Sequence, residues 1–370
     1  MTYDYLIVGA GLYGATFAHQ LHKAGKTCLV IDKRNHTGGN TYCKDIGGIQ
    51  VHQYGAHIFH TNDKRIWDFV NSFVPFKPFI NSPRAKYYHE VYNMPFNMHT
   101  FEQLWGVKTP EEAQQKLATE TAPYKKTNPA NLKEQALSMV GPTIFEKLIK
   151  HYTEKQWGKP CEELPAFLIK RVPLRFTYDN NYFNDTYQGI PVGGYNKLTE
   201  GLLKGVDVKL GVDFFADRAH WLSMVDRVIY TGKIDAYFDY CLGELQYRSL
   251  KFEHKEMHGV NDFQGNAVYN YTSPDVPYTR VVEHKHFEWK ELGHTVVSYE
   301  YPQQYQRGGE AYYPVNDEMN NALYNQYKRL ADKEKKVLFG GRLAEYKYYD
   351  MHQVVAAALH QSQKIISHEQ

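Results

Sequence analysis

The residues that specify the architecture are YDYLIVGAGLYG, residues 3–14, at the start of the chain. Residues 3–8 are mostly apolar and predict a strand, and three glycines follow it within six positions. Residues 12–23 predict a helix that ends before Gly25, and residues 27–32 (TCLVID) predict a second strand. A strand, a glycine turn, a helix and a second strand form a βαβ unit, so the expected fold class is α/β.

The three glycines fit the G-x-G-x-x-G pattern of dinucleotide-binding folds, in the context that this pattern requires. Gly9 makes the tight turn, Gly11 lets a pyrophosphate approach the backbone, and Gly14 lets the helix pack closely on the strand. The amides at the start of the helix favour bound phosphate. Asp32, at the end of the second strand, is placed to bond ribose hydroxyls. These features alone fit NAD and FAD equally.

Two later glycine turns favour FAD. RNHTGGN, residues 34–40, turns the chain again soon after Asp32. Near the other end, Gly340 and Gly341 precede Arg342, and a long amphipathic helix is predicted from Met351 to about residue 366. The second turn and the start of this helix predict another anion site, which suits the ribityl-phosphate half of FAD.

Composition excludes several classes of function. The 43 basic and 41 acidic residues leave a formal net charge of +2, which argues against a general grip on nucleic acid. Four scattered cysteines show no C-x-x-C pairing, so we expect no disulfide framework, no zinc site and a reducing, cytoplasmic setting. No apolar run approaches the roughly 20 residues of a membrane span, and a start that runs directly into a strand leads us to expect no signal peptide.

The rest of the sequence predicts a discontinuous Rossmann-type domain with two insertions. Residues 109–121 and 142–151 are typical of helices, whereas residues 77–92, 175–188 and 247–301 alternate in a way that predicts antiparallel strands. Rossmann-like patterns return at residues 193–232 and 336–341. We therefore expect an FAD-binding domain (1–78, 190–245 and 310–370), an inserted helical domain (96–172) and an antiparallel sheet domain (79–95, 173–189 and 246–309).

Several long motifs resemble those of bacterial UDP-galactopyranose mutase, a flavin-dependent family, in one order along essentially the whole chain. They are RNHTGGN (34–40), YGAHIFHT (54–61), YTEKQWG (152–158), ELPAFLIKR (163–171), YDNNYF (178–183), GIPVGGY (189–195), VPYTRVVEHKHF (276–287) and GGRLAEYKYYDM (340–351). The resemblance implies reversible conversion of UDP-galactopyranose to UDP-galactofuranose, which supplies galactofuranose for cell-surface polysaccharide. It also implies a homodimer and an external reductant such as NAD(P)H, because the FAD is active only when reduced.

In that family the reduced flavin N5 attacks the anomeric carbon and displaces UDP, the sugar opens as a flavin iminium and recloses, and UDP returns. The resemblance thus explains why neither a Ser/His/Asp site nor a paired-carboxylate site is evident in the sequence. The roles below are carried over by motif. Catalysis involves Arg171, Arg280 and His60. FAD is bound by Gly9, Gly11, Tyr13, Gly14, Asp32, Lys33, Gly39, Asn40, His57, Ile58, Arg342, Asp350 and Met351. Substrate is bound by Asn81, Leu148, Tyr152, Thr153, Trp157, Arg171, Tyr182, Asn270, Arg280, Tyr313 and Tyr348.

Physical chemistry supports part of this assignment. Two arginines suit a departing diphosphate because a guanidinium group bonds phosphate oxygens in pairs and stays charged. Arg280 stands in the otherwise uncharged run PYTRVV, where a surface salt bridge is a poor explanation. His57 and His60 have no third metal ligand in register, so no metal is expected. Leu148 and Ile149 replace an aromatic pair that some relatives have near the uridine, which leaves the role of Leu148 open.

Two other hypotheses stay open. A flavin oxidoreductase of the amine-oxidase type would use the same cofactor architecture. A non-catalytic protein that binds nucleotide sugars would keep the fold without the reaction.

Overall fold

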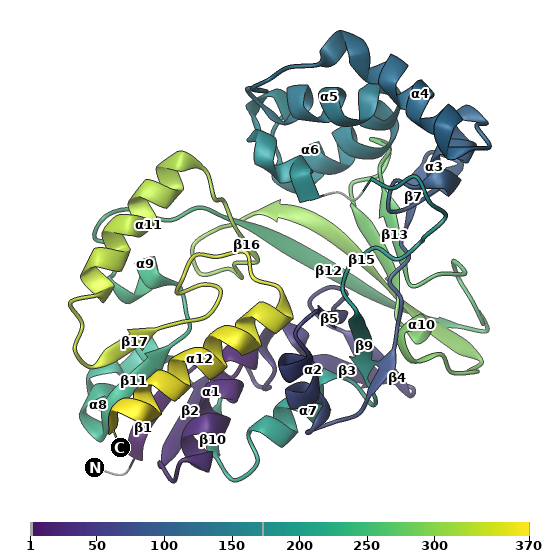
Figure 1. The fold of residues 1–370 in the computed structure, drawn as a ribbon. Helices are drawn as coiled ribbons and strands as arrows, with labels where there is room; N and C mark the ends of the chain where they lie inside the picture. Colours follow the sequence, from purple (N-terminus) through teal and green to yellow (C-terminus); the bar gives the residue numbers. More distant parts are fainter. Residues whose placement is uncertain (1–2, 172–173, 370) are drawn as a thin grey trace. The chain divides into compact units, whose positions relative to one another are not determined.

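The computed structural model describes residues 3–171 and 174–369, apart from the side chains of Lys170, Arg171 and Glu369. The chain forms two compact units (Figure 1). Unit 1 comprises Met1–Pro78, Asp185–Tyr247 and Ala311–Gln370, and unit 2 comprises Phe79–Asn184 and Arg248–Glu310. The separation of unit 2 into a helical and a sheet domain stays a prediction.

Unit 1 is built on a parallel five-stranded sheet with the order β10-β2-β1-β11-β17. Its strands are β1 (Tyr3–Val8), β2 (Cys28–Asp32), β10 (Asp207–Leu210), β11 (Val225–Tyr230) and β17 (Val337–Phe339). All four neighbouring pairs are parallel. Strands from three distant parts of the sequence therefore complete one Rossmann-type sheet, and the predicted α/β class is confirmed.

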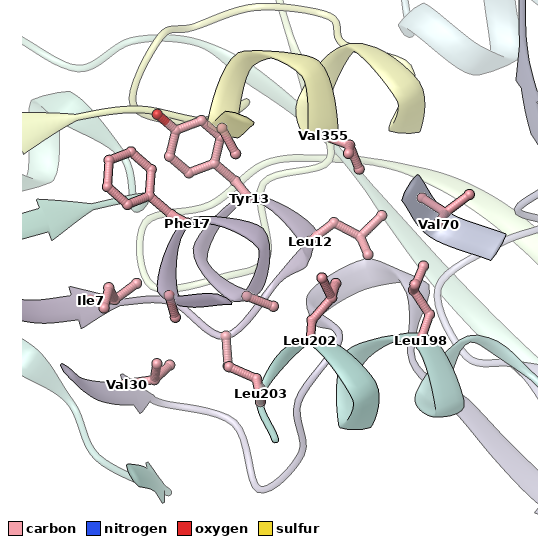
Figure 2. Close-up of a cluster of buried hydrophobic side chains, with 14 of the residues drawn as sticks. Ile7, Leu12, Tyr13, Phe17, Val30, Val70, Leu198, Leu202, Leu203 and Val355 are labelled. Atoms are coloured by element: carbon pink, nitrogen blue, oxygen red, sulfur yellow. The ribbon is translucent and has the colours of Figure 1, made fainter. Parts of the chain in front are cut away.

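The core of unit 1 forms where α1 (Leu12–Lys23) packs between β1 and the last helix, α12 (Met351–Glu369). Figure 2 shows the side chain of Leu12 from α1 between those of Val355 and Leu202, with Tyr13 and Phe17 on the same helix. Full burial of an apolar side chain of this size contributes about 1.5–3 kcal/mol. The motif helix and the C-terminal helix thus stabilise one another.

Smaller elements surround this core. They are the hairpin β3 (Cys43–Ile46) and β4 (Ile49–His52), and the sheet of β5 (Phe59–Thr61), β9 (Tyr187–Pro191) and β6 (Phe76–Pro78). The helices are α2 (Lys64–Asn71), α7 (Tyr195–Leu202), α8 (Arg218–Met224), α9 (Ile234–Tyr237) and α11 (Glu318–Ala331). The short strand β16 (Tyr313–Pro314) and the 3₁₀ turns Gly39–Thr41 and Phe214–Asp217 complete unit 1.

Unit 2 contributes six strands of a largely antiparallel sheet, in the order β12-β15-β14-β13-β7-β8. They are β12 (Tyr247–His258), β15 (His294–Gln304), β14 (Arg280–Glu283), β13 (Val268–Tyr271), β7 (Arg84–Tyr87) and β8 (Glu90–Asn93). β13 and β7 pair in parallel, which differs from the purely antiparallel expectation. Alternating side chains predict strands, but they do not specify which strands become neighbours.

The helices of unit 2 are α3 (Met98–Trp105), α4 (Pro110–Thr121), α5 (Leu132–Ile144), α6 (His151–Trp157) and α10 (Lys285–Glu288). Short 3₁₀ turns cover Ala122–Tyr124, Cys161–Glu163 and Ala166–Arg171. Residues 142–151, predicted as one helix, instead follow a break at Gly141 and run through a π-helix, Phe145–Lys150, into α6. Gly141 has φ of 75°, a conformation that only glycine adopts readily.

The strand predicted over residues 175–186 is wrong, because this stretch is irregular until β9 begins at Tyr187. Side chains in this stretch accept hydrogen bonds from nearby backbone amides, so these amides do not pair with a neighbouring strand. Asp179 Oδ1 accepts from the Asn181 amide at 2.9 Å, and Asn181 Oδ1 accepts from the Phe183 amide at 3.2 Å. Asparagine and aspartate favour turns for this reason.

Among the helices within the described ranges, we find none that combines the length and the apolarity needed to cross a bilayer.

Candidate active site

The glycine turn of unit 1 is closed by close backbone contacts. The Gly9 amide donates to the Ile31 carbonyl at 2.8 Å, and Gly9 has φ of 111°. A Cβ on Gly14 would lie 2.0 Å from the Gly9 carbonyl oxygen. Only glycine therefore fits at position 14, because the first turn of α1 rests directly on the turn that precedes it.

The amides at the start of α1 point to an anion site. Gly11 is the N-cap residue, and no side chain caps the helix. Uncapped amides at a helix start, together with the partial positive charge of the helix dipole, favour a bound phosphate. Asp32 stands beside this turn, because its Oδ2 accepts from the Ala10 amide at 2.7 Å and its Oδ1 from the Arg34 amide at 2.9 Å. The carboxylate predicted to bond ribose is thus fixed at the end of β2, next to Lys33.

The second glycine turn lies against the first. The Gly38 amide donates to the Ala10 carbonyl at 2.8 Å, and a Cβ on Gly39 would lie 3.0 Å from the Gly11 Cα. Asn40 Oδ1 accepts from Arg34 Nη2 at 3.0 Å. The two motifs that the sequence separates by more than 20 positions therefore form one glycine-rich surface.

The C-terminal glycine turn is also part of this region. A Cβ on Gly340 would lie 2.1 Å from the Tyr13 hydroxyl oxygen, so the ring of Tyr13 occupies that space. The same hydroxyl donates to Gln361 Oε1 of α12 at 2.7 Å, and burial raises its pKa. Arg342 donates to the Tyr312 carbonyl, and burial lowers its pKa. Asp350 and Met351 then stand at the start of α12.

His60 on β5 is held by a carboxylate. Its Nδ1 lies 2.5 Å from Asp185 Oδ2, and Asp185 Oδ1 accepts from Asn62 Nδ2 at 2.6 Å. Since a carboxylate only accepts, Nδ1 is the nitrogen of His60 that carries the proton in this pair. The ring of His352 lies edge-on to His60, with centroids 5.3 Å apart. Burial and the neighbouring His60 lower the pKa of His352.

Four other predicted residues belong to unit 1. His57 Nδ1 lies 2.7 Å from the Gly55 carbonyl oxygen, and Ile58 is buried. Tyr313 and Tyr348 stack with centroids 5.5 Å apart, and Tyr348 is exposed.

Unit 2 brings together three of the predicted substrate residues around Arg280. Arg280 Nε donates to Asn270 Oδ1 at 3.2 Å, across the β13–β14 pair. Its Nη2 donates to the Tyr152 hydroxyl, also at 3.2 Å, and Tyr152 comes from α6. A guanidinium, an amide and a phenol from three segments thus converge on one place, as a site for a phosphorylated ligand requires.

A carboxylate that the sequence reasoning missed completes this cluster. Glu300 Oε2 lies 3.3 Å from Arg280 Nη1, and the Glu300 side chain is only 4% exposed. The two residues are direct cross-strand partners on β14 and β15. The signal available in the sequence is a lone acidic residue in the run HTVVSYEY, residues 294–301. Its meaning depends on the strand register, which a single sequence does not specify.

The other predicted substrate residues of unit 2 are more dispersed. Trp157 packs against the helical core, and Thr153 is half-buried on the same helix. The Asn81 carbonyl accepts from the Tyr182 amide at 2.8 Å. Leu148 is 4% exposed within the core of the helices, so its contact with a nucleobase stays a prediction without support from its position. The side chain of Arg171 lies outside the described residues.

One expectation about metals needs correction. His60 does have metal-capable neighbours, because atoms of His60, Asp350 and His352 lie within 4.8 Å of one another. The sequence spacing does not reveal this group, because two of its three residues lie at the start of α12, far from His60 in the sequence. Asp350 is also predicted to contact FAD, and one nitrogen of His60 is already bonded to Asp185. We therefore assign no metal to this group.

Comparison with known proteins gives one consistent result. The family model GLF, described as UDP-galactopyranose mutase, matches residues 147–348, and a model of the NAD(P)-binding Rossmann-like domain matches residues 7–73. A probable UDP-galactopyranose mutase of Klebsiella pneumoniae is 38% identical over 367 residues, which cover 98% of this chain and 94% of the relative. A dTDP-fucopyranose mutase of Escherichia coli is 37% identical over 369 residues, which cover 98% of each chain.

A crystal structure of reduced UDP-galactopyranose mutase has the same fold, with a TM-score of 0.76 over 99% of this chain and 94% of the other. Its identity is 14%, so this match concerns the fold alone. The sequence relatives show the family as well as the fold, because they align with 98% of this chain. This chain belongs to the UDP-galactopyranose mutase family, a family of isomerases.

Proposed function

We propose that this chain interconverts UDP-galactopyranose and UDP-galactofuranose, with FAD in its reduced form as the cofactor. The observation that carries the proposal is the cluster of Arg280, Tyr152 and Asn270. The sequence motifs assign these three residues to one diphosphate and uridine site, and their hydrogen bonds to one another support that assignment.

The residues of unit 1 fit FAD. The close backbone contacts at Gly14 and Gly39 leave no room for side chains at these two positions, as expected for a turn that a pyrophosphate approaches. Gly9, Gly11 and Gly39 would face the phosphates, and Asp32 the adenosine ribose. Arg342, Asp350 and Met351 would hold the flavin half. When bound and reduced, FAD would supply the nucleophilic nitrogen, N5.

The role of Arg280 in this reaction is to hold UDP as it leaves and returns. The diphosphate gains negative charge when its bond to the sugar breaks, so a fixed guanidinium stabilises the transition state more than the ground state. Arg171 is proposed as the second cation. The ring of Tyr152 is proposed to stack on uracil, with Thr153 and Trp157 on the same side, while Asn81, Tyr182, Tyr313 and Tyr348 contact the phosphates and the sugar.

His60 is proposed to act at the sugar side of the flavin. Its bond to Asp185 fixes the orientation of the imidazole ring. A histidine of fixed orientation suits a reaction in which sugar hydroxyls exchange protons as the ring opens and closes.

A second candidate substrate is a dTDP-6-deoxysugar. The Escherichia coli dTDP-fucopyranose mutase is 37% identical to this chain, nearly the same as the 38% of the Klebsiella relative. The two substrates differ at the base methyl group, at the 2′-hydroxyl of the nucleoside and at the sugar C6 hydroxyl. A pocket for one methyl group discriminates only about 10- to 200-fold, so both substrates need to be tested.

We further propose a homodimer in the reducing cytoplasm, where a reductant such as NAD(P)H keeps the flavin reduced. The product would serve as a galactofuranose donor for surface polysaccharide. The four free cysteines suit that compartment.

The test is turnover by dithionite-reduced enzyme. UDP-galactofuranose and dTDP-fucofuranose are supplied separately, and the pyranose products are separated by ion-exchange chromatography. We expect efficient formation of UDP-galactopyranose. Faster turnover of dTDP-fucofuranose would replace the proposed substrate, and oxidation of an amine without any turnover of either sugar would favour the oxidoreductase hypothesis.

A further inference from the structure

A lysine that no part of the proposed reaction uses lies at the centre of the Arg280 region. Lys155 is on α6, between Tyr152 and Trp157. Its Nζ lies 2.9 Å from the Tyr271 carbonyl oxygen, 2.8 Å from that of Ser273, 3.2 Å from that of Val276 and 3.1 Å from that of Tyr278. One ammonium group is thus surrounded by four backbone carbonyls.

All four carbonyls belong to one short connection. β13 ends at Tyr271 and β14 begins at Arg280, so these oxygens belong to the loop between the two strands and its margins. Asn270 and Arg280 stand at its two ends and bond to one another. A single cation therefore joins the helix that carries Tyr152 to the loop that sets the spacing of Asn270 and Arg280.

Two further contacts tie the same helix to the sheet. Arg248 Nε, from β12, donates to the Gln156 carbonyl at 2.9 Å. Thr279 Oγ1 lies 3.5 Å from Gln156 Oε1. A seven-residue helix such as α6 has little stability of its own, so contacts of this kind determine its position.

The chemistry of the carbonyl cluster favours a cation. Carbonyl oxygens gathered around one point repel one another unless a positive charge lies between them. An ammonium group has three N–H donors. With four carbonyl oxygens within reach, at least one N–H is therefore shared between two oxygens. Burial lowers the pKa of Lys155 to about 8, although Asp275 acts in the opposite direction. Such a costly placement is uncommon for a lysine that serves only solubility.

We propose that Lys155 is a positioning residue of the substrate site, whose ammonium group fastens α6 to the β13–β14 loop and so keeps Tyr152 and Arg280 in register on UDP. This inference rests on the proposed function, because the placement of Tyr152 and Arg280 against UDP matters only in an enzyme that binds a UDP-sugar. The fastening itself is a property of unit 2 alone.

The test removes the ammonium group and then returns it. Lys155→Met keeps the apolar stem and deletes the charge. We expect kcat/KM for UDP-galactofuranose to fall by about 100-fold, the scale at which a misplacement of about 1 Å acts. FAD content and the visible flavin spectrum stay unchanged. Hydrogen exchange of the amides in residues 272–279 should become faster, because the loop loses its anchor.

Lys155→Ala provides the second arm. It leaves space beside the four carbonyls, so methylammonium chloride should restore activity in a saturable way. Tetramethylammonium chloride, which has no N–H donors, should not, and neither should sodium chloride at matched ionic strength. Lys147→Met is the matched control, because Lys147 precedes α6 and bonds to Glu90 and Tyr92 rather than to the loop. We expect its kcat/KM to match that of the wild type.

The outcomes separate the two proposals. Wild-type kcat/KM together with unchanged loop exchange in Lys155→Met would overturn the positioning role. A loss of activity without faster loop exchange, and without rescue by methylammonium, would overturn it as well. A wild-type enzyme that converts no UDP-sugar contradicts the proposed function, whereas the exchange measurement still decides whether Lys155 fastens the loop.

Discussion

Replacement of Arg280 separates the chemistry of the site from its stability. In Arg280→Ala, the leaving diphosphate loses its proposed guanidinium partner. Removal of one preorganised donor at a developing charge typically costs about 10²–10³-fold in kcat, so loss of a group that donates twice to phosphate should cost at least roughly 10³-fold. FAD content should not change, because the residues predicted for FAD belong to unit 1.

The same replacement also removes the cation of the Arg280–Glu300 ion pair. Its carboxylate is 4% exposed, and Oε2 lies 3.3 Å from Arg280 Nη1. Breaking a buried ion pair on one side costs about 3–5 kcal/mol, but the Arg280 side chain is 29% exposed, so water that enters its place should reduce the cost to about 1–3 kcal/mol. Glu300→Gln in the Arg280→Ala background should recover most of that stability and none of the activity.

The assay follows each quantity separately. Turnover of UDP-galactofuranose by dithionite-reduced enzyme measures kcat, urea unfolding measures stability, and visible absorption measures bound flavin. Arg280→Lys keeps the charge without the paired geometry and should fall between wild type and Arg280→Ala. If Arg280→Ala turned over within about tenfold of wild type, the arginine would be structural and its proposed role toward the leaving group would be disproved.

Three further predictions follow from the structure. Gly14→Ala places a Cβ 2.0 Å from the Gly9 carbonyl oxygen, so the purified variant should lose most of its FAD absorption, whereas Gly293→Ala, with open space around it, should keep it. Burial, with His254 nearby, holds the pKa of His284 at about 3, below the roughly 6.5 of an unfolded histidine. Between these two pKa values, the unfolded chain therefore binds a proton at His284 that the folded chain does not bind. The free energy of unfolding should fall by up to roughly 4–5 kcal/mol as the pH drops from about 6.5 to 3. Urea unfolding at a series of pH values should show a free energy of unfolding that depends less on pH in His284→Gln than in the wild type; an equal pH dependence in the two proteins would contradict the assignment. Turnover should also require a reductant, so full activity of air-oxidised enzyme would rule out the reduced flavin as the active form.

Local sequence patterns predicted the Rossmann core well. The glycine spacing, the apolar residues of α1 and the strand ending in Asp32 act over short distances, so a single sequence specifies them. The structure confirms the helix over Leu12–Lys23 at the predicted residues and β2 to within one residue. Local patterns did not predict the contact between the two N-terminal glycine turns, because it depends on a tertiary hydrogen bond from the Gly38 amide to the Ala10 carbonyl.

The candidate site shows where sequence reasoning stops. Arg280, Tyr152 and Asn270 were found through motif resemblance, and the structure places them in contact. Glu300 and Lys155 were missed because their partners are set by strand register and by the path of a loop. The strand predicted over residues 175–186 failed for the opposite reason, since local bonds from asparagine and aspartate side chains overrode an alternating pattern.

The decisive measurement for a flavin-dependent mutase begins with the colour of the purified protein. We predict a yellow protein that binds FAD, and that on reduction converts UDP-galactofuranose to UDP-galactopyranose without net oxidation of the sugar. A folded protein that is colourless, takes up no added FAD and leaves the nucleotide sugar unchanged would contradict the proposed function.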